Sequence, residues 1–135
     1  MQLNLSTDIA LRTLIYLGQK GMPATIAEVS EAFDISKTHL MKVVMMLVAA
    51  NLLISERGRN GGVRLARDAR NIHIGEVVRL MENNLALVAC MKEQVTNDIC
   101  PLMPQCRLRT ILDNAQHAFL STLDKSSLAD ILPVK

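Results

Sequence analysis

One segment of the chain, residues 52–65, constrains the fold more than any other. Residues 52–55 and 63–65 are short apolar runs typical of strands, and a glycine-rich stretch separates them. Within that stretch, Asn60 and Gly61 stand in tandem, a pair that favours positive φ angles and a tight turn between strands. The segment therefore predicts a small antiparallel β-hairpin.

Two helical segments precede the hairpin, and a short turn joins them. Thr25 and Glu28 have the spacing of a capping box and begin the first helix, which runs to Phe33. Ser36 can cap the second helix, which continues to about residue 50. Two such helices followed by a hairpin have the layout of a winged helix-turn-helix. The helices alone also leave open a small helical domain of another kind.

Three further helices are expected. One covers residues 8–17 with Ser6 or Thr7 as its cap, and another covers residues 72–82. The last covers residues 107–123 and carries an apolar stripe at helical spacing. A helix this long must bury its stripe, and a two-fold partner is the expected cover. Packing onto its own domain is the alternative.

The composition fits this architecture and excludes several others. Hydrophobic residues make up 50% of the chain, which excludes disorder, and aromatic residues only 2%, which disfavours modules that stack on single-stranded bases. No apolar run approaches the length of a membrane span, so we expect a cytoplasmic protein with no membrane partner.

The expected fold is mainly α with a small β-hairpin. It divides into a winged helix-turn-helix domain over residues 1–80, a cysteine-containing loop over 81–106, and a dimerisation helix with a C-terminal tail over 107–135.

The small net charge of +2 hides a local concentration of arginine. Residues 57–70 contain five arginines and one acid, and arginine suits phosphate pairs and narrow minor grooves. A solvated turn would explain any single arginine, but five of them on a hairpin after a helix-turn-helix indicate duplex DNA. The expected major-groove contacts are Lys37, Thr38, His39 and Lys42, with Ser36 on a phosphate; the expected minor-groove contacts are Arg59 and Asn60, flanked by Arg57 and Arg64. Solvent exposure is the alternative for His39.

The three cysteines lie in a polar, irregular segment. Nine residues separate Cys90 from Cys100, and five residues, including two prolines, separate Cys100 from Cys106. An odd number of cysteines argues against a disulfide framework. Thiolates in a stiff loop suit soft metals and iron–sulfur clusters, although a four-ligand site lacks one donor. Spacing alone leaves open structural zinc, a thiol switch, three unrelated buried cysteines, and a cluster with a non-cysteine ligand.

Taken together, these segments resemble the Rrf2 family of bacterial winged-helix regulators that carry iron–sulfur clusters. The resemblance covers nearly the whole chain and rests on the three-cysteine loop together with residues 3–17, 57–65, 74–78 and 127–132. It implies a transcription regulator and not an enzyme. An electron-transfer or catalytic iron–sulfur protein is disfavoured as well, because the sequence offers no nucleophile–base pair or cofactor-binding loop.

Three branches of the family differ at a few positions. Cluster-assembly regulators have a His at the place of Arg109 and an acid at the place of Met41, and rhizobial iron-responsive regulators tend to have Asn at the place of Asp8. The nitric-oxide-sensing NsrR branch has Asp there. Residues 87–90 and 104–108 are also similar to that branch, whereas the interval between the first two cysteines is longer than is usual for it.

The NsrR resemblance implies a ligand set and a signal. Cys90, Cys100 and Cys106 would hold the cluster, with a four-iron form favoured over a two-iron form, and Asp8 of the partner subunit would be the fourth ligand, held by Arg12. The implied protein is a homodimeric repressor that binds palindromic operator DNA and is released when nitric oxide reacts with the cluster. The alternatives are an iron- or cluster-status-responsive repressor of the same family and a metal-free thiol-switch regulator. Without the resemblance, a charge beside the helix dipole would explain Asp8.

Overall fold

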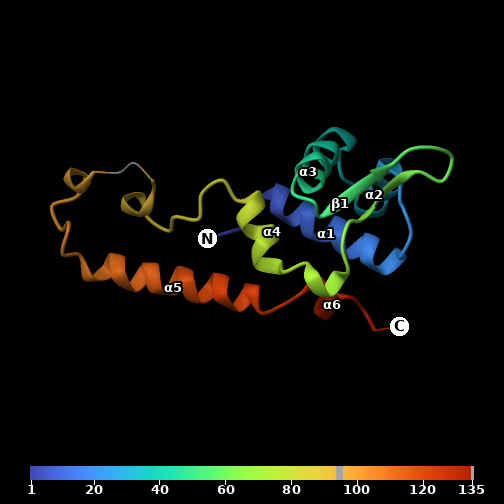
Figure 1. Ribbon diagram of the computed structural model, residues 1–135. Helices are drawn as coiled ribbons and strands as arrows, with labels where there is room; N and C mark the ends of the chain where they lie inside the picture. Colours follow the sequence, from blue (N-terminus) through green and yellow to red (C-terminus); the bar gives the residue numbers. More distant parts are fainter. Residues whose placement is uncertain (94–95, 135) are drawn as a thin grey trace.

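The structure, a computed structural model, describes residues 1–93 and 96–134. It consists of a rounded helical domain and a long arm that leaves this domain and returns to it (Figure 1). The elements in chain order are α1 (Leu5–Lys20), α2 (Ile26–Phe33), α3 (Lys37–Ala49), β1 (Leu53–Glu56), β2 (Gly62–Leu65), η1 (Ala69–Asn71), α4 (Ile74–Met81), η2 (Ala89–Met91), η3 (Asn97–Ile99), α5 (Arg107–Asp124) and α6 (Leu128–Ile131). The expected fold class, mainly α with a two-stranded hairpin, is confirmed.

The helix-turn-helix forms as its capping residues predict. Thr25 and Glu28 form both hydrogen bonds of a capping box, at 2.6 and 3.1 Å. Asp34 adopts a left-handed conformation and ends α2. The Ser36 hydroxyl then accepts a hydrogen bond from the backbone N–H of His39 and begins α3. Local capping therefore fixes where the two helices meet.

Helix α1 begins earlier and ends later than its apolar pattern predicts. Its cap is Asn4, whose side-chain oxygen accepts a hydrogen bond from the backbone N–H of Thr7 at 2.8 Å, so the prediction of Ser6 or Thr7 as the cap is wrong. The Asn4 amide also donates to the carbonyl of Met81, at the end of α4. A contact between segments far apart in sequence therefore selects the residue at which α1 begins.

The hairpin forms, but its turn is not the predicted one. Strand β1 pairs with β2 so that Glu56 faces Gly62, and residues 57–61 form the connecting loop. The positive φ angles lie at Gly58 (107°) and Gly62 (143°), so the tight turn predicted at Asn60 and Gly61 is wrong. A Cβ on Gly62 would lie 2.3 Å from the carbonyl oxygen of Ala24, which forms a β-bridge with Val63. Glycine is required here because the hairpin lies directly against that backbone.

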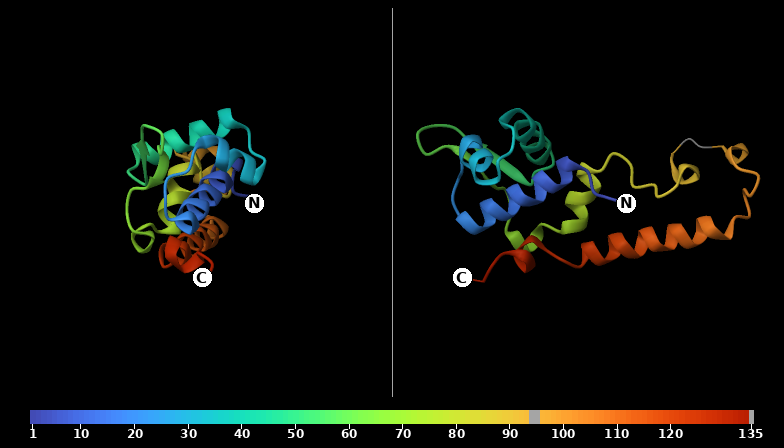
Figure 2. Two further views of the ribbon diagram at one scale, coloured as in Figure 1. Left: turned by 90° about the vertical axis from the view of Figure 1, so that its right-hand side faces the viewer. Right: turned by 180° about the vertical axis from the view of Figure 1, so that it is seen from behind.

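The arm returns to the domain through α6. The backbone N–H of Leu128 donates to the carbonyl of Ile72 at 2.7 Å, and the Leu128 side chain is fully buried in the same core as α1 and α3. Arg79 and Asp124 form an ion pair that fastens the end of α5 to α4. Figure 2 shows α5 extending away from the domain from this attachment point. Among the described residues, no helix combines the length and the apolar character that crossing a membrane requires.

Candidate DNA-binding surface and cysteine loop

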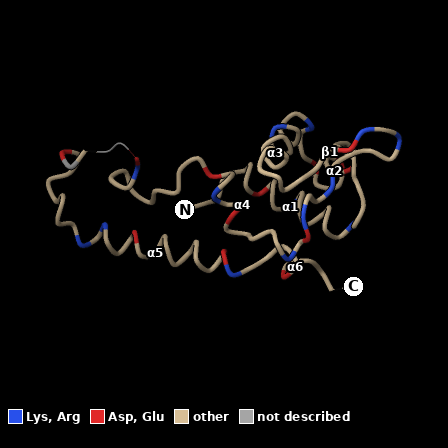
Figure 3. The backbone as a smooth tube through the Cα atoms, viewed as in Figure 1, with Lys and Arg blue, Asp and Glu red and all other residues tan. Residues whose placement is uncertain are grey.

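Helix α3 presents one polar face to solvent at its first turns. Leu40 and Val43 are buried on the opposite side of the helix. Lys37, Thr38 and Lys42 are all exposed. Figure 3 shows these cations on α3 along the same edge of the molecule as those at the tip of the hairpin. Exposed cations of α3 and of the hairpin tip therefore lie along one edge of the molecule.

His39 is not simply exposed to solvent. Its Nε2 lies 3.1 Å from the Ser6 hydroxyl, within hydrogen-bond distance, and the side chain is only partly exposed. Ser6 belongs to the first turn of α1, so this contact joins the start of α3 to the start of α1. His39 is therefore partly exposed and partly held by α1, and its contact with DNA stays a prediction.

Three of the five arginines in residues 57–70 are paired with acids. Arg64 pairs with Glu56 across the hairpin. Arg67 reaches both carboxylate oxygens of Glu76, at 2.6 and 3.3 Å, and so fastens the segment after the hairpin to α4. Because these carboxylates offset their charges, both side chains contribute to holding the fold together.

Arg70 forms the third of these pairs, with Asp68. The hydrogen bonds from Arg70 lower the pKa of Asp68 to about 2, because they favour the ionised carboxylate. Arg57 and Arg59, at the tip of the hairpin, are exposed, and neither pairs with an acid within residues 1–93 and 96–134. The free positive charge of this segment is therefore concentrated at its tip, beside the exposed Asn60.

The three cysteines are free thiols on the arm. Cys90 lies in η2, Cys100 follows η3, and Cys106 immediately precedes α5. All three are half-buried. This donor set has the chemistry that an iron–sulfur cluster needs. In the part of the chain that the structure describes, however, no three His, Cys, Asp or Glu side chains lie close enough together to hold a metal ion.

Asp8 lies on a different part of the molecule, in the first turn of α1. Arg12, one helical turn later, holds both of its carboxylate oxygens, at 3.1 and 2.9 Å. The Asp8 side chain is nevertheless 45% exposed. In Figure 1 the cysteine loop lies along the arm, away from the domain that contains α1. Asp8 is therefore oriented and accessible, but it does not form a site with the cysteines of its own chain.

A polar cluster, which we call the α1–α4 junction, joins the start of α1 to the start of the cysteine loop. One carboxylate oxygen of Glu82 accepts hydrogen bonds from the backbone N–H of Asn4 at 2.8 Å and from the hydroxyl of Thr7 at 2.7 Å. This junction was not predicted. No local pattern indicates it, because more than 70 residues separate its two sides.

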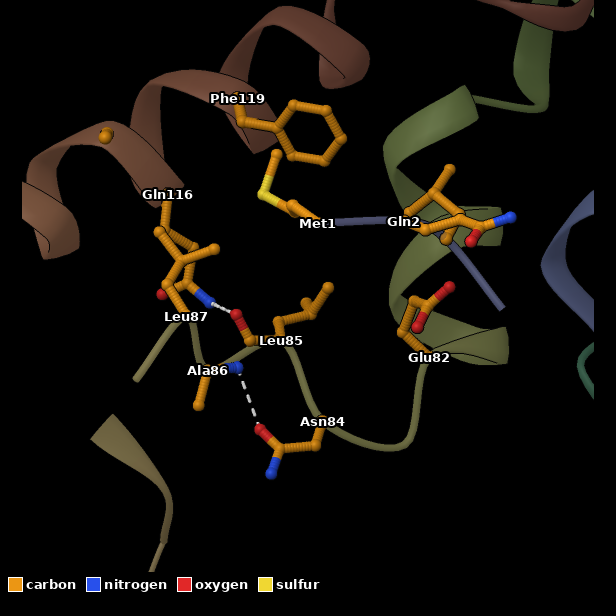
Figure 4. A pocket seen from close by; sticks show the side chains of 11 residues that line it. Met1, Gln2, Glu82, Asn84, Leu85, Ala86, Leu87, Gln116 and Phe119 are labelled. Carbon is orange, nitrogen blue, oxygen red and sulfur yellow. Dashed lines mark hydrogen bonds between the residues drawn. The ribbon is translucent and has the colours of Figure 1, made fainter. Parts of the chain in front are cut away.

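A cavity of about 380 Å³ lies between the N-terminus, the segment after α4, and α5. Figure 4 shows Met1 and Phe119 on one side of it and Leu85 on the other. The amide of Gln116 donates to the carbonyl of Leu85 and closes one end. A second cavity, of about 350 Å³, lies beside Cys106 and Arg109. Asp113 also lines this second cavity.

Comparison with known proteins agrees with this architecture. Residues 3–133 match the Rrf2 family, which is described as "Iron-dependent Transcriptional regulator". CymR, the global cysteine regulator of B. subtilis, is similar, with a TM-score of 0.77 and 23% identity over 97% of this chain and 95% of that one. IscR of T. potens is similar with a TM-score of 0.74 and 20% identity, over 97% and 85% of the two chains. The oxidized form of Staphylococcus aureus CymR has a TM-score of 0.77 and 21% identity, over 100% and 98%.

These identities establish a shared fold, and the family match extends over almost the whole chain. The family and its structural neighbours are transcription regulators, not enzymes. With its helix-turn-helix, its basic hairpin tip and its returning arm, the chain belongs to the Rrf2 family of transcriptional regulators.

Proposed function

We propose that this chain is a homodimeric iron–sulfur repressor that binds palindromic operator DNA and is released when nitric oxide reacts with the cluster. The observation that carries the proposal is the separation of the candidate ligands. Three free thiols lie on the arm, while an accessible carboxylate, already oriented by Arg12, lies on the domain. A chain with this arrangement needs a second copy to complete a four-ligand site.

The apolar stripe of α5 supports the dimer. Leu108, Ile111 and Phe119 are 60%, 63% and 37% exposed on one side of the helix. Leu112 and Leu123 are only partly exposed. Part of the apolar stripe of α5 therefore packs against its own chain, and the rest is uncovered. We assign the uncovered part to the two-fold interface. The proposed division gives DNA binding to residues 1–80, cluster binding to residues 81–106 and dimerisation to residues 107–135, in which α5 provides the interface and α6 packs into the core of the domain.

In this proposal Cys90, Cys100 and Cys106 hold the cluster together with Asp8 of the partner subunit. Arg12 keeps the carboxylate of Asp8 in one orientation and offsets its charge while no iron is bound. When bound, the cluster supplies iron that nitric oxide can attack, and an oxygen ligand is the weakest of the four. The chain's own contribution is to place that ligand on α1, whose first turn contacts the start of α3, the helix with the exposed polar face.

The first turn of α1 can connect the cluster with DNA. It contains Asp8 and also Ser6, which contacts His39 at the start of α3. Asn4 and Thr7 fasten the same turn to Glu82 through the α1–α4 junction. Loss of the Asp8 ligand would remove one of the contacts that hold this turn, and the contact with His39 would pass a shift of the turn to the recognition helix. In this way a chemical event at the cluster would shift the recognition helix between two positions.

An anaerobic titration tests the proposed function. The protein purified without oxygen should be brown and should bind a palindromic duplex tightly, and nitric oxide should bleach the cluster and release the DNA in parallel. If the cluster forms but DNA binding depends on iron supply and not on nitric oxide, the protein is an iron-responsive repressor. The description of the family as iron-dependent favours this second candidate. A colourless protein whose binding follows dithiothreitol would be a thiol switch.

Replacing Asp8 by alanine should alter the cluster spectrum and make cluster loss to a chelator at least tenfold faster. The reason is that even residues that only support a metal ligand contribute tenfold or more to metal affinity. Glu31→Ala is the matched control, since it also removes an exposed carboxylate, one that lies on α2 and away from the cysteine loop. An unchanged spectrum and unchanged loss rate in Asp8→Ala would exclude Asp8 as a ligand.

Replacing Arg59 by alanine should weaken duplex binding and reduce the slope of log K against log salt by about one unit for each hairpin on the DNA. Arg59 is exposed at the hairpin tip, and no acid among the described residues offsets its charge. Arg70→Ala is the control, because Asp68 already pairs with Arg70. Binding isotherms between about 50 and 300 mM salt, a roughly sixfold range, measure both slopes. Equal slopes for Arg59→Ala and the unchanged protein would contradict the minor-groove role of the hairpin.

A further inference from the structure

The recognition helix α3 exposes methionines on the face expected to meet DNA. Met41, Met45 and Met46 are 52%, 69% and 39% exposed, although α3 already buries a complete apolar stripe on its opposite side. Large apolar side chains that cluster on a solvated face mark a contact surface. The packing of the chain itself gives no reason for them.

Two of these methionines lie among the polar residues predicted to contact DNA. Met41 and Met45 are one helical turn apart, and Met45 is two turns beyond Thr38, so the three side chains share one strip of the helix. Lys37 and Lys42 are exposed nearby. Helices of this class enter the major groove with their N-terminal residues at the base edges. The strip therefore combines an apolar centre with flanking cations.

The major groove of duplex DNA contains one apolar group that such a strip could contact. Each base edge in the major groove presents hydrogen-bonding atoms, and thymine alone adds a methyl group, at its C5 atom. Methionine is unbranched and polarizable, so it adapts its shape to a small apolar target. We propose that Met41 and Met45 contact thymine methyl groups in each operator half-site and so determine its sequence. The inference rests on the DNA-binding part of the proposed function and not on the cluster or its signal.

A second copy of the chain is a poorer occupant of this face. Helix α3 has two lysines and no acid, so two copies packed through it would bring like charges together. Duplex DNA instead places phosphates on both sides of the groove, where they can offset Lys37 and Lys42. The uncovered stripe of α5 is a separate surface on the arm and already provides a place for the second copy.

Substitution of uracil for thymine tests the inference, because the two bases differ only by the methyl group. A duplex is first selected from a random-sequence library with the full-length protein purified without oxygen, and each thymine is then replaced in turn. At one or two positions in each half-site, uracil should weaken binding by about fourfold, which corresponds to one lost methyl contact. Met41→Ala or Met45→Ala should bind thymine and uracil equally at those positions.

Met22→Ala is the matched control, since Met22 is 59% exposed outside α3 and should leave the discrimination unchanged. If uracil weakens binding at no position, or if both α3 variants still distinguish thymine from uracil, the inference fails while the proposed function stands. If the protein selects no duplex at all, both fail. A change in oligomeric state of the α3 variants without a change in discrimination would assign the methionines to a second copy and overturn the inference.

Discussion

Replacing Ile111 by glutamate is expected to convert the proposed dimer into monomers and to abolish operator binding. Ile111 is 63% exposed at the middle of the uncovered stripe of α5. A fully buried aliphatic side chain contributes about 1.5–3 kcal/mol, and a two-fold interface contains the position twice. The loss is therefore about 3 kcal/mol or more, which raises the dimer dissociation constant at least about a hundredfold.

Sedimentation equilibrium of the Ile111→Glu protein measures this effect, and a fluorescence binding assay with a palindromic duplex measures its consequence. His117→Glu is the matched control, because His117 is 74% exposed on the polar side of the same helix. The control should remain a dimer and bind DNA. If Ile111→Glu also remains a dimer at micromolar concentration, the interface lies elsewhere.

Replacing Leu128 by alanine is expected to destabilise the whole domain. The Leu128 side chain is fully buried in the core that α1 and α3 share, and truncation of a buried leucine costs about 2–5 kcal/mol. A domain of this size has a free energy of unfolding of only about 5–15 kcal/mol, so the variant should unfold at a clearly lower urea concentration.

Urea unfolding followed by circular dichroism checks this expectation. Leu102→Ala is the control, because Leu102 is 66% exposed on the arm, and a surface substitution of this kind changes stability by about 0.5 kcal/mol or less. A loss of less than about 1 kcal/mol in Leu128→Ala would mean that α6 is not part of the cooperative core.

The helices and their caps could be predicted because local chemistry decides them. The capping box of Thr25 and the Ser36 cap each depend on residues within three positions, and both are confirmed. The hairpin strands also follow from their apolar pattern. Its turn does not, because the backbone of Ala24 approaches Gly62 and sets the conformation there. The predicted start of α1 was wrong because it, too, depends on a contact distant in sequence: the Asn4 side chain donates a hydrogen bond to the end of α4.

The candidate site could be predicted only in part. Residue types and spacing pointed to the basic hairpin and to the exposed N-terminal residues of α3. They did not show that Arg67 would pair with Glu76, and Arg64 with Glu56, because pairing depends on how the elements pack. The exposure of the α3 methionines was not predicted either, since methionine at helical spacing is equally typical of a core. The α1–α4 junction has no sequence signal at all.

The return of α6 to the domain also sets when the protein can act during its own synthesis. Leu128 fills the core of a DNA-binding domain whose other elements end at Met81, so that core stays open until roughly 50 further residues have been made. A ribosome adds about 5–20 residues per second, so the domain waits roughly 2–10 seconds for its last core side chain. By then the cysteine loop and α5 have also been synthesised. The core of the domain therefore receives this side chain only after the proposed sensing and pairing segments have been made.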